Sequence, residues 1–378
     1  MHVLILPSWY FPADSNEIRG RMFQQHAKAL QKKGIEARIL FAEFNADSPF
    51  KMKMNYAVEE GIPTWRARQW YPPKVHSLLI RLWIKKYAAL IHDYIQKEGR
   101  PDIIHAQSYL TGIIAARIFQ KTSIPFIVTE RLSSFITGKI PGRYKPFIKK
   151  TFDEARQITC VSPGLKKKIQ LYTSKNIEVV PNFFDPVVFY HDPLVRKNEI
   201  FTWVSVGEPS YIKGLDRLVH AFGQARKILP SVKMQLILID NIREKEELIK
   251  IADEYQITDD IIWTGLISQT EIADILRNSH VFVSASRVET FGKSILEAQA
   301  CGLPVVATST DGASYIMSHP DQGIVIPNHD TGKLMDALHE MCRNYNLYNA
   351  EKITTSVTRF RQDTIIEQWL DIYHKIAG

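Results

Sequence analysis

Two glutamates, Glu289 and Glu297, stand eight positions apart on either side of a glycine turn at 290–292. The apolar run 280–284 before them predicts a buried strand, and the apolar residues after the turn repeat at helical spacing. Such a turn leaves free backbone N–H groups at the positive end of a helix, which favours phosphate binding. The two carboxylates would then contact different parts of one ligand, such as two hydroxyl-rich rings joined by a diphosphate. The same spacing also fits a buried helix cap plus a surface carboxylate.

Length and composition indicate a folded, soluble protein of two domains. A chain of 378 residues is too long for one ordinary core, and 45% of its residues are hydrophobic. We expect residues 1–6 to form a first strand rather than a signal peptide, because they lack a basic flank and a long apolar run. No run reaches the roughly 20 apolar residues of a membrane-spanning helix. Three cysteines without metal-ligand spacing favour the reducing cytoplasm.

The net charge of +8 is unevenly distributed. Residues 1–185 contain 29 Lys and Arg against 15 Asp and Glu, whereas residues 186–378 have a net charge of −6. Within 131–176, 11 basic residues face only two acidic ones. This asymmetry indicates that the first half contacts an anionic surface or polymer. A nucleic-acid partner is not expected, because no nucleic-acid-binding motif is present and the basic residues are spread over several segments.

Strand and helix patterns alternate along both halves, which indicates an α/β fold with two parallel sheets wound by crossover helices. The predicted strands are 3–6, 37–41, 103–105, 126–129, 158–161, 178–180, 201–206, 234–239, 261–263, 280–284, 305–308 and 323–325. The predicted helices are 21–33, 77–97, 110–120, 144–155, 163–171, 214–228, 244–255, 269–278, 293–301, 312–318, 331–344 and 364–376.

A proline-punctuated link at 185–193 separates the halves. We therefore expect a Rossmann-like domain over 1–185, a second over 186–360, and a terminal helix over 361–378 that crosses back to the first domain. Segments 44–75 and 132–143 are expected to be loops. Ligands of doubly wound sheets usually bind at the carboxyl ends of the strands, so a cleft between the domains would hold the site.

The ordered motifs resemble family 4 of the retaining glycosyltransferases, which have the GT-B fold of two doubly wound Rossmann-like domains facing each other across a cleft. The resemblance is sharpest in the Glu289 and Glu297 pattern, the tail Ala300–Val306, Lys213-Gly214 and Val180–Asp185. The first half matches more loosely, through Gly20–Phe23, Pro101–His105 and Val161–Pro163. The likeness spans nearly the whole chain.

The resemblance implies a nucleotide diphosphate-sugar donor on the second domain. Glu297 would accept hydrogen bonds from two ribose hydroxyls, because a carboxylate offers two acceptor oxygens to a vicinal diol. Glu289, with the N–H groups of Phe291 and Gly292, would hold the hydroxyls of the donor sugar. Lys213 would neutralise the diphosphate as the glycosidic bond breaks, which is the main catalytic task.

The same resemblance implies further positions. Gly207 ends the first strand of the second domain beside the diphosphate, and Ile267 lies near the base of the nucleotide. Gly20, after the first strand of the chain, is expected on the acceptor side. Such enzymes retain the anomeric configuration, need no metal and use no cofactor apart from the donor substrate.

Two departures from the family pattern affect the diphosphate site. Glu208 stands where the family commonly has an arginine, and an unpaired carboxylate there would repel the diphosphate. Lys293 is the first candidate for the missing positive charge and Arg287 is the second, although either also fits an ordinary surface cation. Asp240-Asn241 replaces two glycines that usually let the backbone approach the ligand.

A third departure lies in the first half. The family triplet Thr-Glu-His is Thr129-Glu130-Arg131 here. A guanidinium cannot act as a base at neutral pH but can bind a phosphate bidentately, so Arg131 would face a phosphorylated acceptor. A structural arginine paired with Glu130 or another acid is the alternative. His105 is a candidate acceptor residue, but it also fits a packed histidine at a strand end.

Aromatic and basic residues are interleaved in the first half. The predicted helix 77–97 has Trp83 and Tyr87 on one stripe with Arg81, Lys85 and His92 opposite, and the segment 65–74 is similarly mixed. This composition suits the headgroup zone of an anionic membrane, although a core-packed helix with ordinary surface cations fits it too.

The sequence therefore predicts a cytoplasmic hexosyl- or N-acetylhexosaminyltransferase, peripheral at the inner face of the cell membrane. Its donor would be a nucleotide-sugar such as a UDP-sugar. Its acceptor would be a saccharide, as a glycolipid or a lipid-linked saccharide, in the synthesis of a surface polysaccharide. Two alternatives remain, which are transfer to a soluble acceptor such as a sugar phosphate and nucleotide-sugar binding without catalysis.

Overall fold

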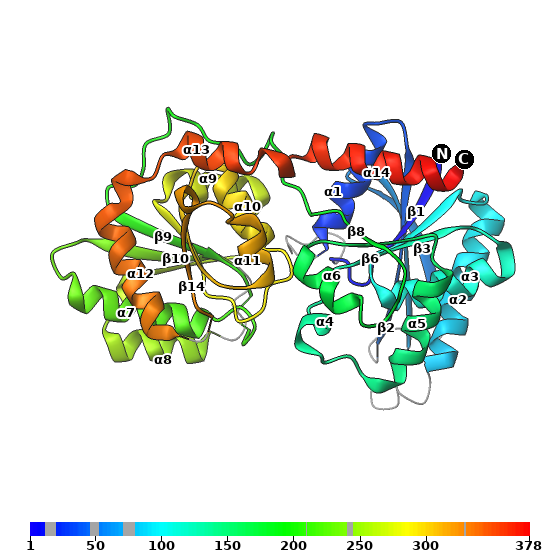
Figure 1. Cartoon of the computed structure of the whole chain (residues 1–378), viewed down its shortest axis with the longest axis horizontal. Coiled ribbons are helices and arrows are strands. Elements are labelled where there is room, and N and C mark those ends of the chain that lie inside the picture. Colours follow the sequence, from blue (N-terminus) through cyan, green and yellow to red (C-terminus); the bar gives the residue numbers. More distant parts are fainter. Residues whose placement is uncertain (12–19, 46–52, 71–79, 209, 240–244, 329) are drawn as a thin grey trace. The chain divides into compact units, whose positions relative to one another are not determined.

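The structure, a computed structural model, describes residues 1–11, 20–45, 53–70, 80–208, 210–239, 245–328 and 330–378 (Figure 1). The predicted loop residues Asp240-Asn241 lie outside these ranges. The chain forms two compact units, which are described separately below. Unit 1 contains Met1–Val180 and Ile366–Gly378, and unit 2 contains Pro181–Ile365.

Unit 1 is built on an eight-stranded sheet in the order β3-β4-β2-β1-β5-β6-β7-β8. All neighbours are parallel except β3 and β4, which form an antiparallel hairpin at one edge. The strands are β1 His2–Leu6, β2 Glu36–Asn45, β3 Lys53–Glu59, β4 Ile62–Trp70, β5 Ile103–Ala106, β6 Phe126–Glu130, β7 Gln157–Cys160 and β8 Ile177–Val179.

The helices of unit 1 lie on both faces of this sheet. They are α1 Arg21–Gln31, α2 Ile80–Glu98, α3 Tyr109–Thr122, α4 Ser134–Thr137, α5 Lys145–Glu154 and α6 Pro163–Ile169. Since parallel crossovers are right-handed, α1 lies on the face opposite to α2, α3, α5 and α6, whose crossovers run the other way along the sheet. The last helix, α14 Gln362–Ala377, lies next to α1 (Figure 1).

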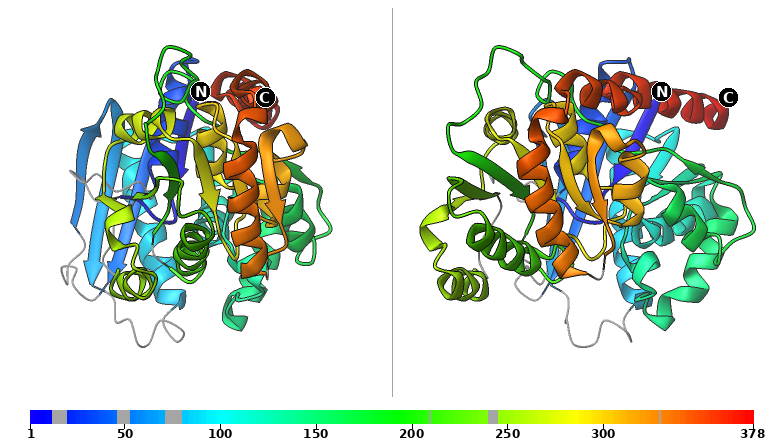
Figure 2. Two further views of the ribbon diagram at one scale, coloured as in Figure 1. Left: turned by 90° about the vertical axis from the view of Figure 1, so that its left-hand side faces the viewer. Right: turned by 60° about the vertical axis from the view of Figure 1, so that its left-hand side comes forward.

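Unit 2 has a six-stranded, fully parallel sheet in the order β11-β10-β9-β12-β13-β14. Its strands are β9 Phe201–Val206, β10 Met234–Ile239, β11 Ile261–Gly265, β12 Val281–Ser284, β13 Val305–Thr308 and β14 Gly323–Ile326. Its helices are α7 Leu215–Ile228, α8 Glu246–Tyr255, α9 Gln269–Asn278, α10 Lys293–Ala300, α11 Asp311–Ile316, α12 Thr331–Asn344 and α13 Ala350–Ser356. Helices α7 and α12 pack side by side (Figure 2).

The β3–β4 hairpin was not predicted, because segment 44–75 is taken for a loop at the sequence level. Its strands meet at Glu60 and Gly61, which both have positive φ, of 47° and 86°. A two-residue turn of this kind matches the twist of a hairpin. Along β4, Trp65 and Ala67 are buried and alternate with charged neighbours, and this period of two was the available signal.

The aromatic stripe of α2 packs inside unit 1. Trp83, Tyr87 and Tyr94 are buried, and Trp65 of β4 contacts Tyr94 edge-on with ring centroids 4.9 Å apart. The expectation that these aromatic rings contact a membrane surface is therefore wrong, because they are already part of the hydrophobic core. The basic residues Arg81 and Lys85 on the opposite side of α2 are exposed.

The observed units differ slightly from the predicted boundaries. Unit 1 ends at Val180, five residues before the predicted limit, and the terminal helix returns to unit 1 from Ile366 onward. Helix α13 was not predicted, and neither was α4 in the expected loop 132–143. Within the described ranges, no helix combines the length and the apolar character that crossing a membrane would require.

Candidate functional site

The switch point of the unit 2 sheet places the predicted donor residues together. Strands β9 and β12 are neighbours, but the chain leaves β9 toward β10 and leaves β12 toward β13, in opposite directions. Ligands of doubly wound sheets bind where the direction of winding reverses in this way. Lys213 follows β9 and Glu289 follows β12, so the tertiary structure joins two residues that are 76 positions apart.

Lys213 and Glu289 form an ion pair, in which Nζ of Lys213 donates to Oε2 of Glu289 at 2.7 Å. The N–H groups of Phe291 and Gly292 also donate to the Glu289 carboxylate. Burial by itself raises the pKa of Glu289, but Lys213 and the two amides outweigh it and hold the pKa below its usual value. The carboxylate of Glu289 is therefore charged, and it accepts hydrogen bonds from the same ammonium and amide groups that a phosphate would need.

Glycines allow the backbone segments of this site to approach one another closely. An added Cβ at Gly214 would lie 2.2 Å from the carbonyl oxygen of Ala285, and one at Gly312 would lie 2.4 Å from the carbonyl carbon of Phe291. Gly214 also has a φ of +66°, which L side chains rarely adopt. The glycine after Lys213 thus fixes the start of α7 against the loop that follows β12.

Glu297 and Lys293 form a second ion pair on the first turns of α10. Gly292, with a φ of 88° and a ψ of 51°, precedes the helix, and Glu297 lies on its second turn with only 8% of its surface exposed. The side chain of Lys293 is 23% exposed, and its ammonium lies 6.0 Å from the ring of Phe189. Lys293 is therefore near the mouth of the turn, as predicted, but its charge is balanced by Glu297.

Arg287 is held by the protein itself. Its guanidinium donates to both carboxylate oxygens of Asp216, at 2.8 and 2.6 Å, and to the carbonyl of Tyr211 at 2.8 Å. The hydrogen bonds to Asp216 raise the pKa of Arg287. These contacts pin the loop after β12 to the start of α7. Direct contact of Arg287 with a diphosphate stays a prediction.

The remaining predicted donor residues lie at the same edge of the sheet. Gly207 follows β9, and a Cβ added there would lie 3.4 Å from Cδ of Lys213. Phe291 is buried and packs edge-on against Phe360 with ring centroids 5.7 Å apart. Ile267, two residues beyond β11, is half-buried, and Glu208 is exposed. Contact of these residues with a nucleotide stays a prediction.

Gly20 in unit 1 occupies a position that excludes a side chain. Its φ is +85°, it precedes α1, and an added Cβ would lie 2.9 Å from Cα of Tyr10 and 3.1 Å from the carbonyl oxygen of Trp9. The glycine therefore lets the loop after β1 pass close to the start of α1. Its predicted place on the acceptor side stays a prediction.

His105 is a core residue rather than an acceptor residue. It is fully buried, and its Nδ1 and Nε2 lie 2.6 Å from the hydroxyls of Tyr373 and Thr129 respectively. Trp369 of α14 covers the ring at a centroid distance of 4.7 Å. Burial holds the pKa of His105 well below its usual value, with further lowering by His26. The expectation of an acceptor contact is corrected, because both ring nitrogens already bind the chain.

Arg131 is half-buried beside a buried carboxylate. The side-chain Nε of Arg131 donates to Oε1 of Gln107 at 3.1 Å, and the backbone N–H of Arg131 donates to Oε1 of Glu130 at 2.9 Å. Glu130 also accepts hydrogen bonds from the N–H groups of Tyr109 and Leu132. These hydrogen bonds lower the pKa of Glu130, but burial has the larger effect and raises it to about 7. Burial lowers the pKa of Arg131 to about 10, so the guanidinium stays charged at neutral pH. Binding of a phosphorylated acceptor by Arg131 stays a prediction.

Several residues that organise these sites were not predicted. Asp216 holds Arg287, and its place on the first turn of a helix that begins after Lys213-Gly214 was the available signal. Tyr373 and His26, which are hydrogen-bonded to each other at 3.1 Å, have no local signal because they are 347 residues apart. Among the described residues, no group of three His, Cys, Asp or Glu side chains is placed to hold a metal ion.

Comparisons with known proteins cover both halves of the chain. The family model Glycosyl transferases group 1 matches residues 190–355, and the model Glycosyltransferase Family 4 matches residues 20–188. Among curated relatives, N-acetyl-alpha-D-glucosaminyl L-malate synthase of Bacillus anthracis is 24% identical over 236 residues, which are 59% of this chain and 61% of that protein. The gpi3 subunit of phosphatidylinositol N-acetylglucosaminyltransferase of Schizosaccharomyces pombe is 23% identical over 242 residues, 63% of this chain and 50% of that protein.

These matches span between about half and two thirds of each relative.

Solved structures match over the whole chain. A sucrose-phosphate synthase from Thermosynechococcus elongatus has a TM-score of 0.82 and 18% identity, covering 100% of this chain and 99% of that one. The Anabaena protein HepE in complex with UDP-glucose has a TM-score of 0.75 and 15% identity, covering 99% and 100%.

At these identities the solved structures establish the fold, and the two family models together account for most of the chain. The predicted GT-B fold is confirmed by neighbours with the same pair of parallel-sheet α/β domains. The chain belongs to family 4 of the glycosyltransferases.

Proposed function

We propose that this protein is a retaining glycosyltransferase that moves a sugar from a nucleotide diphosphate-sugar to a hydroxyl of a glycolipid or lipid-linked saccharide. The observation that carries the proposal is the pair Lys213 and Glu289 at the switch point of unit 2, where Glu289 also accepts from the amides at the start of α10. A cation and aligned amides at one point stabilise the charge that develops on a departing diphosphate.

The donor would bind by exchanging partners with Glu289. The diphosphate would take over Lys213 and amides at the Gly292 turn, and the freed carboxylate would accept hydrogen bonds from hydroxyls of the donor sugar. Glu297, on the second turn of α10, would accept two ribose hydroxyls in place of Lys293, whose ammonium would turn toward the diphosphate. Because Lys213 and Lys293 are paired with acids in this structure, the diphosphate would have to displace both carboxylates, and hydrogen bonds from hydroxyls of the donor would then stabilise the displaced charges.

Retention of configuration would follow if the acceptor hydroxyl attacks from the same face as the departing diphosphate. A metal-independent reaction fits the chemistry of the residues present, because Lys213, Lys293 and the dipole of α10 supply positive charge at one place. A UDP-sugar is the first donor to test, since the structural neighbour HepE was solved with UDP-glucose.

A lipid-linked acceptor fits the charge of the first half. Residues 1–185 have a net charge of +14, which favours peripheral contact with an anionic membrane at its cytoplasmic face. One relative is named for an acceptor of this class, phosphatidylinositol. Transfer to a soluble acceptor is the second candidate, since another relative is named for L-malate.

The donor site is tested by two substitutions and one control. We expect Lys213→Ala to reduce kcat/KM by about 10²- to 10³-fold, as loss of one oxyanion donor does, with little change in unfolding temperature. Glu289→Gln, which keeps an acceptor for the amides but removes the charge, should lower kcat in the same assay. Lys250→Ala removes an exposed lysine of α8 and should change neither quantity. Near-normal turnover in both site variants would show that the site assignment is wrong.

Binding and acceptor class are measured separately. Calorimetry with UDP, GDP and ADP identifies the nucleotide, and tight binding without transfer to any acceptor would support a binding protein instead of an enzyme. Transfer that requires lipid or detergent and weakens with salt supports the lipid-linked acceptor. Salt-insensitive transfer to a sugar phosphate or a small hydroxy acid supports the soluble acceptor.

A further inference from the structure

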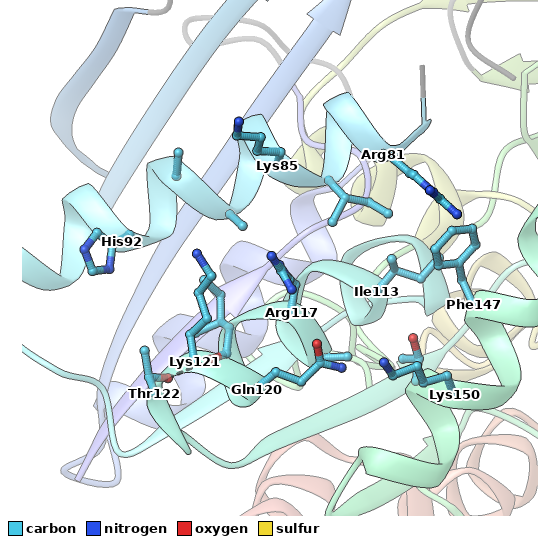
Figure 3. Close-up of a pocket in the computed structure, with 16 residues that line it drawn as sticks. Arg81, Lys85, His92, Ile113, Arg117, Gln120, Lys121, Thr122, Phe147 and Lys150 are labelled. Atoms are coloured by element: carbon cyan, nitrogen blue, oxygen red, sulfur yellow. Dashed lines mark hydrogen bonds between the residues drawn. The ribbon is translucent and has the colours of Figure 1, made fainter. Parts of the chain in front are cut away.

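A pocket of about 630 Å³ opens between α2, α3 and α5 of unit 1 (Figure 3). Helix α3 packs against both of its neighbours, so the pocket lies over α3 and between the other two helices. Every lining residue belongs to unit 1. None of the lining residues is among the predicted donor residues of unit 2.

The base of the pocket is apolar. Ile84 and Ala88 of α2, Ile113 and Ala116 of α3, and Phe147 of α5 line it. The first four are buried and Phe147 is half-buried. A hollow of this size with an apolar base favours a ligand with a hydrocarbon portion, because filling it removes apolar surface from water.

The rim of the pocket is basic. Arg81, Lys85, Arg117, Lys121 and Lys150 line it and are exposed, and no lining residue is acidic. Arg117 and Lys121 extend from α3 toward α2 (Figure 3).

Little of this positive charge is balanced by the protein. Within the described part of the chain, the four rim cations on α2 and α3 make no ion pair. Lys150 lies 3.8 Å from Glu154, which also accepts hydrogen bonds from Gln120. Uncompensated cations around an apolar base complement a molecule with an anionic head and an apolar chain.

We propose that this pocket binds one anionic phospholipid of the membrane surface. Its phosphate would lie among Arg117, Lys121 and Lys85, and the start of an acyl chain would cover Ile113 and Phe147. A free phosphate would leave the apolar base exposed, and a zwitterionic lipid would leave the rim charge unbalanced. The inference rests on the proposed peripheral membrane contact and gives it a specific lipid-binding site.

The site is tested with monomeric lipid and with vesicles. Calorimetry compares dihexanoyl phosphatidylglycerol with dihexanoyl phosphatidylcholine and glycerol 3-phosphate. Both lipids are used below their critical micelle concentrations. Sedimentation uses phosphatidylcholine vesicles with and without phosphatidylglycerol. Among the monomeric compounds, we expect only the short-chain phosphatidylglycerol to bind. Among the vesicles, we expect only those that contain phosphatidylglycerol to bind the protein.

Two variants separate the pocket from general surface charge. Ala89→Trp places a large side chain at an exposed lining position without changing charge, and Arg117→Glu with Lys121→Glu reverses two rim charges. The matched control, Lys167→Glu with Lys168→Glu, makes the same change of charge on exposed residues of α6 outside the pocket. Both pocket variants should weaken phosphatidylglycerol binding by at least about tenfold, and the control by much less.

The outcomes are distinguishable from those of the proposed function. If Ala89→Trp binds monomeric and vesicular lipid normally, or if the α6 control loses as much as the rim variant, the pocket proposal is overturned while membrane contact stands. If glycerol 3-phosphate binds as well as the lipid, the site is a simple anion site and the proposal also fails. If monomeric phosphatidylglycerol binds in the pocket but no vesicle does, the pocket proposal is supported and the membrane contact is not.

Discussion

The two units have the same kind of switch point but use it differently. In unit 2, the carboxyl ends of β9 and β12 lead to Lys213 and Glu289, whose side chains are 32% and 15% exposed and charged. In unit 1, β1 and β5 are the corresponding neighbours, and His105 of β5 is fully buried and hydrogen-bonded to Tyr373 of α14. One switch point is therefore open to exchange of partners, and the other is sealed by the last helix.

The difference follows from the cost of replacing a partner. A ligand that has both a phosphate and hydroxyls can replace each partner of a partly exposed ion pair, so the exchange leaves neither Lys213 nor Glu289 without a partner. Leaving a buried polar group without a partner costs about 1–3 kcal/mol, so the network around His105 stays closed in the folded chain. The comparison teaches that residue type alone does not mark a site, since the exposure of the group decides whether it can bind a ligand.

The covering helix gives the largest expected effect. Trp369 is 1% exposed and packs against His26, with ring centroids 5.2 Å apart, and against His105. Trp369→Ala should destabilise unit 1 by about 3–5 kcal/mol, because it leaves a large cavity in a packed core. Denaturant unfolding measures this loss, with Trp369→Phe as the milder control. Loss of transfer at unchanged stability would contradict the packing role and indicate substrate contact.

Two glycines with nearly the same φ sharpen the comparison between units. Gly214 (φ +66°) would bring a Cβ to 2.2 Å from the carbonyl of Ala285, whereas Gly138 (φ +68°) has nothing within 4 Å. Gly138→Ala should cost about 1–2 kcal/mol for the left-handed conformation alone. Gly214→Ala should cost a further ~1–3 kcal/mol for the collision and should weaken nucleotide binding by displacing Lys213. Denaturant unfolding measures both losses, and equal losses in the two variants would contradict the close approach at Gly214.

The buried histidines predict a pH dependence of unit 1. Burial lowers the pKa of His26 from 6.5 to about 3, with a smaller contribution from Arg131. At this histidine the folded form therefore binds fewer protons than the unfolded form. The stability that neutral His26 contributes is fully present above pH 6.5 and is lost as the pH decreases toward 3. Between pH 7 and pH 5 the contribution of His26 to the free energy of unfolding should fall by about 2 kcal/mol. His26→Gln should reduce this slope in denaturant unfolding, and an unchanged slope would contradict the assignment.

The ion pair of Lys213 and Glu289 in unit 2 should lose its stabilising effect at a lower pH than His26 does, and the loss should be smaller. The pKa of Glu289 lies below its usual 4.5, because Lys213 and two amides outweigh the effect of burial. Stability from this pair is present above pH 4.5 and is lost as the pH falls through the lowered pKa. The loss should be smaller than that caused by His26, since solvent screens the partly exposed Lys213. Glu289→Gln should abolish it in acid unfolding, and an effect already present at pH 6 would contradict the pairing.

Much of the fold was predictable from local pattern. The strands 201–206, 234–239 and 305–308 and the helices 269–278 and 331–344 have the predicted bounds, because each is a short apolar or amphipathic segment ended by turn residues. The β3–β4 hairpin was missed, since its Glu60-Gly61 turn is a less common signal than Asn-Gly. The aromatic stripe of α2 was predicted, but the surface that it contacts was not, because periodicity does not say what covers an apolar face.

The sequence by itself determined the elements of the candidate site, namely a glycine turn, a helix beginning at Lys293 and carboxylates at 289 and 297, because these depend on residues close together in the chain. Only the tertiary structure decided which charges meet. Lys213 pairs with Glu289, Arg287 is held by Asp216, and His105 is sealed by Tyr373, across separations of 76, 71 and 268 residues. Such partners are set by strand order and by the return of α14 to unit 1, which no local spacing encodes.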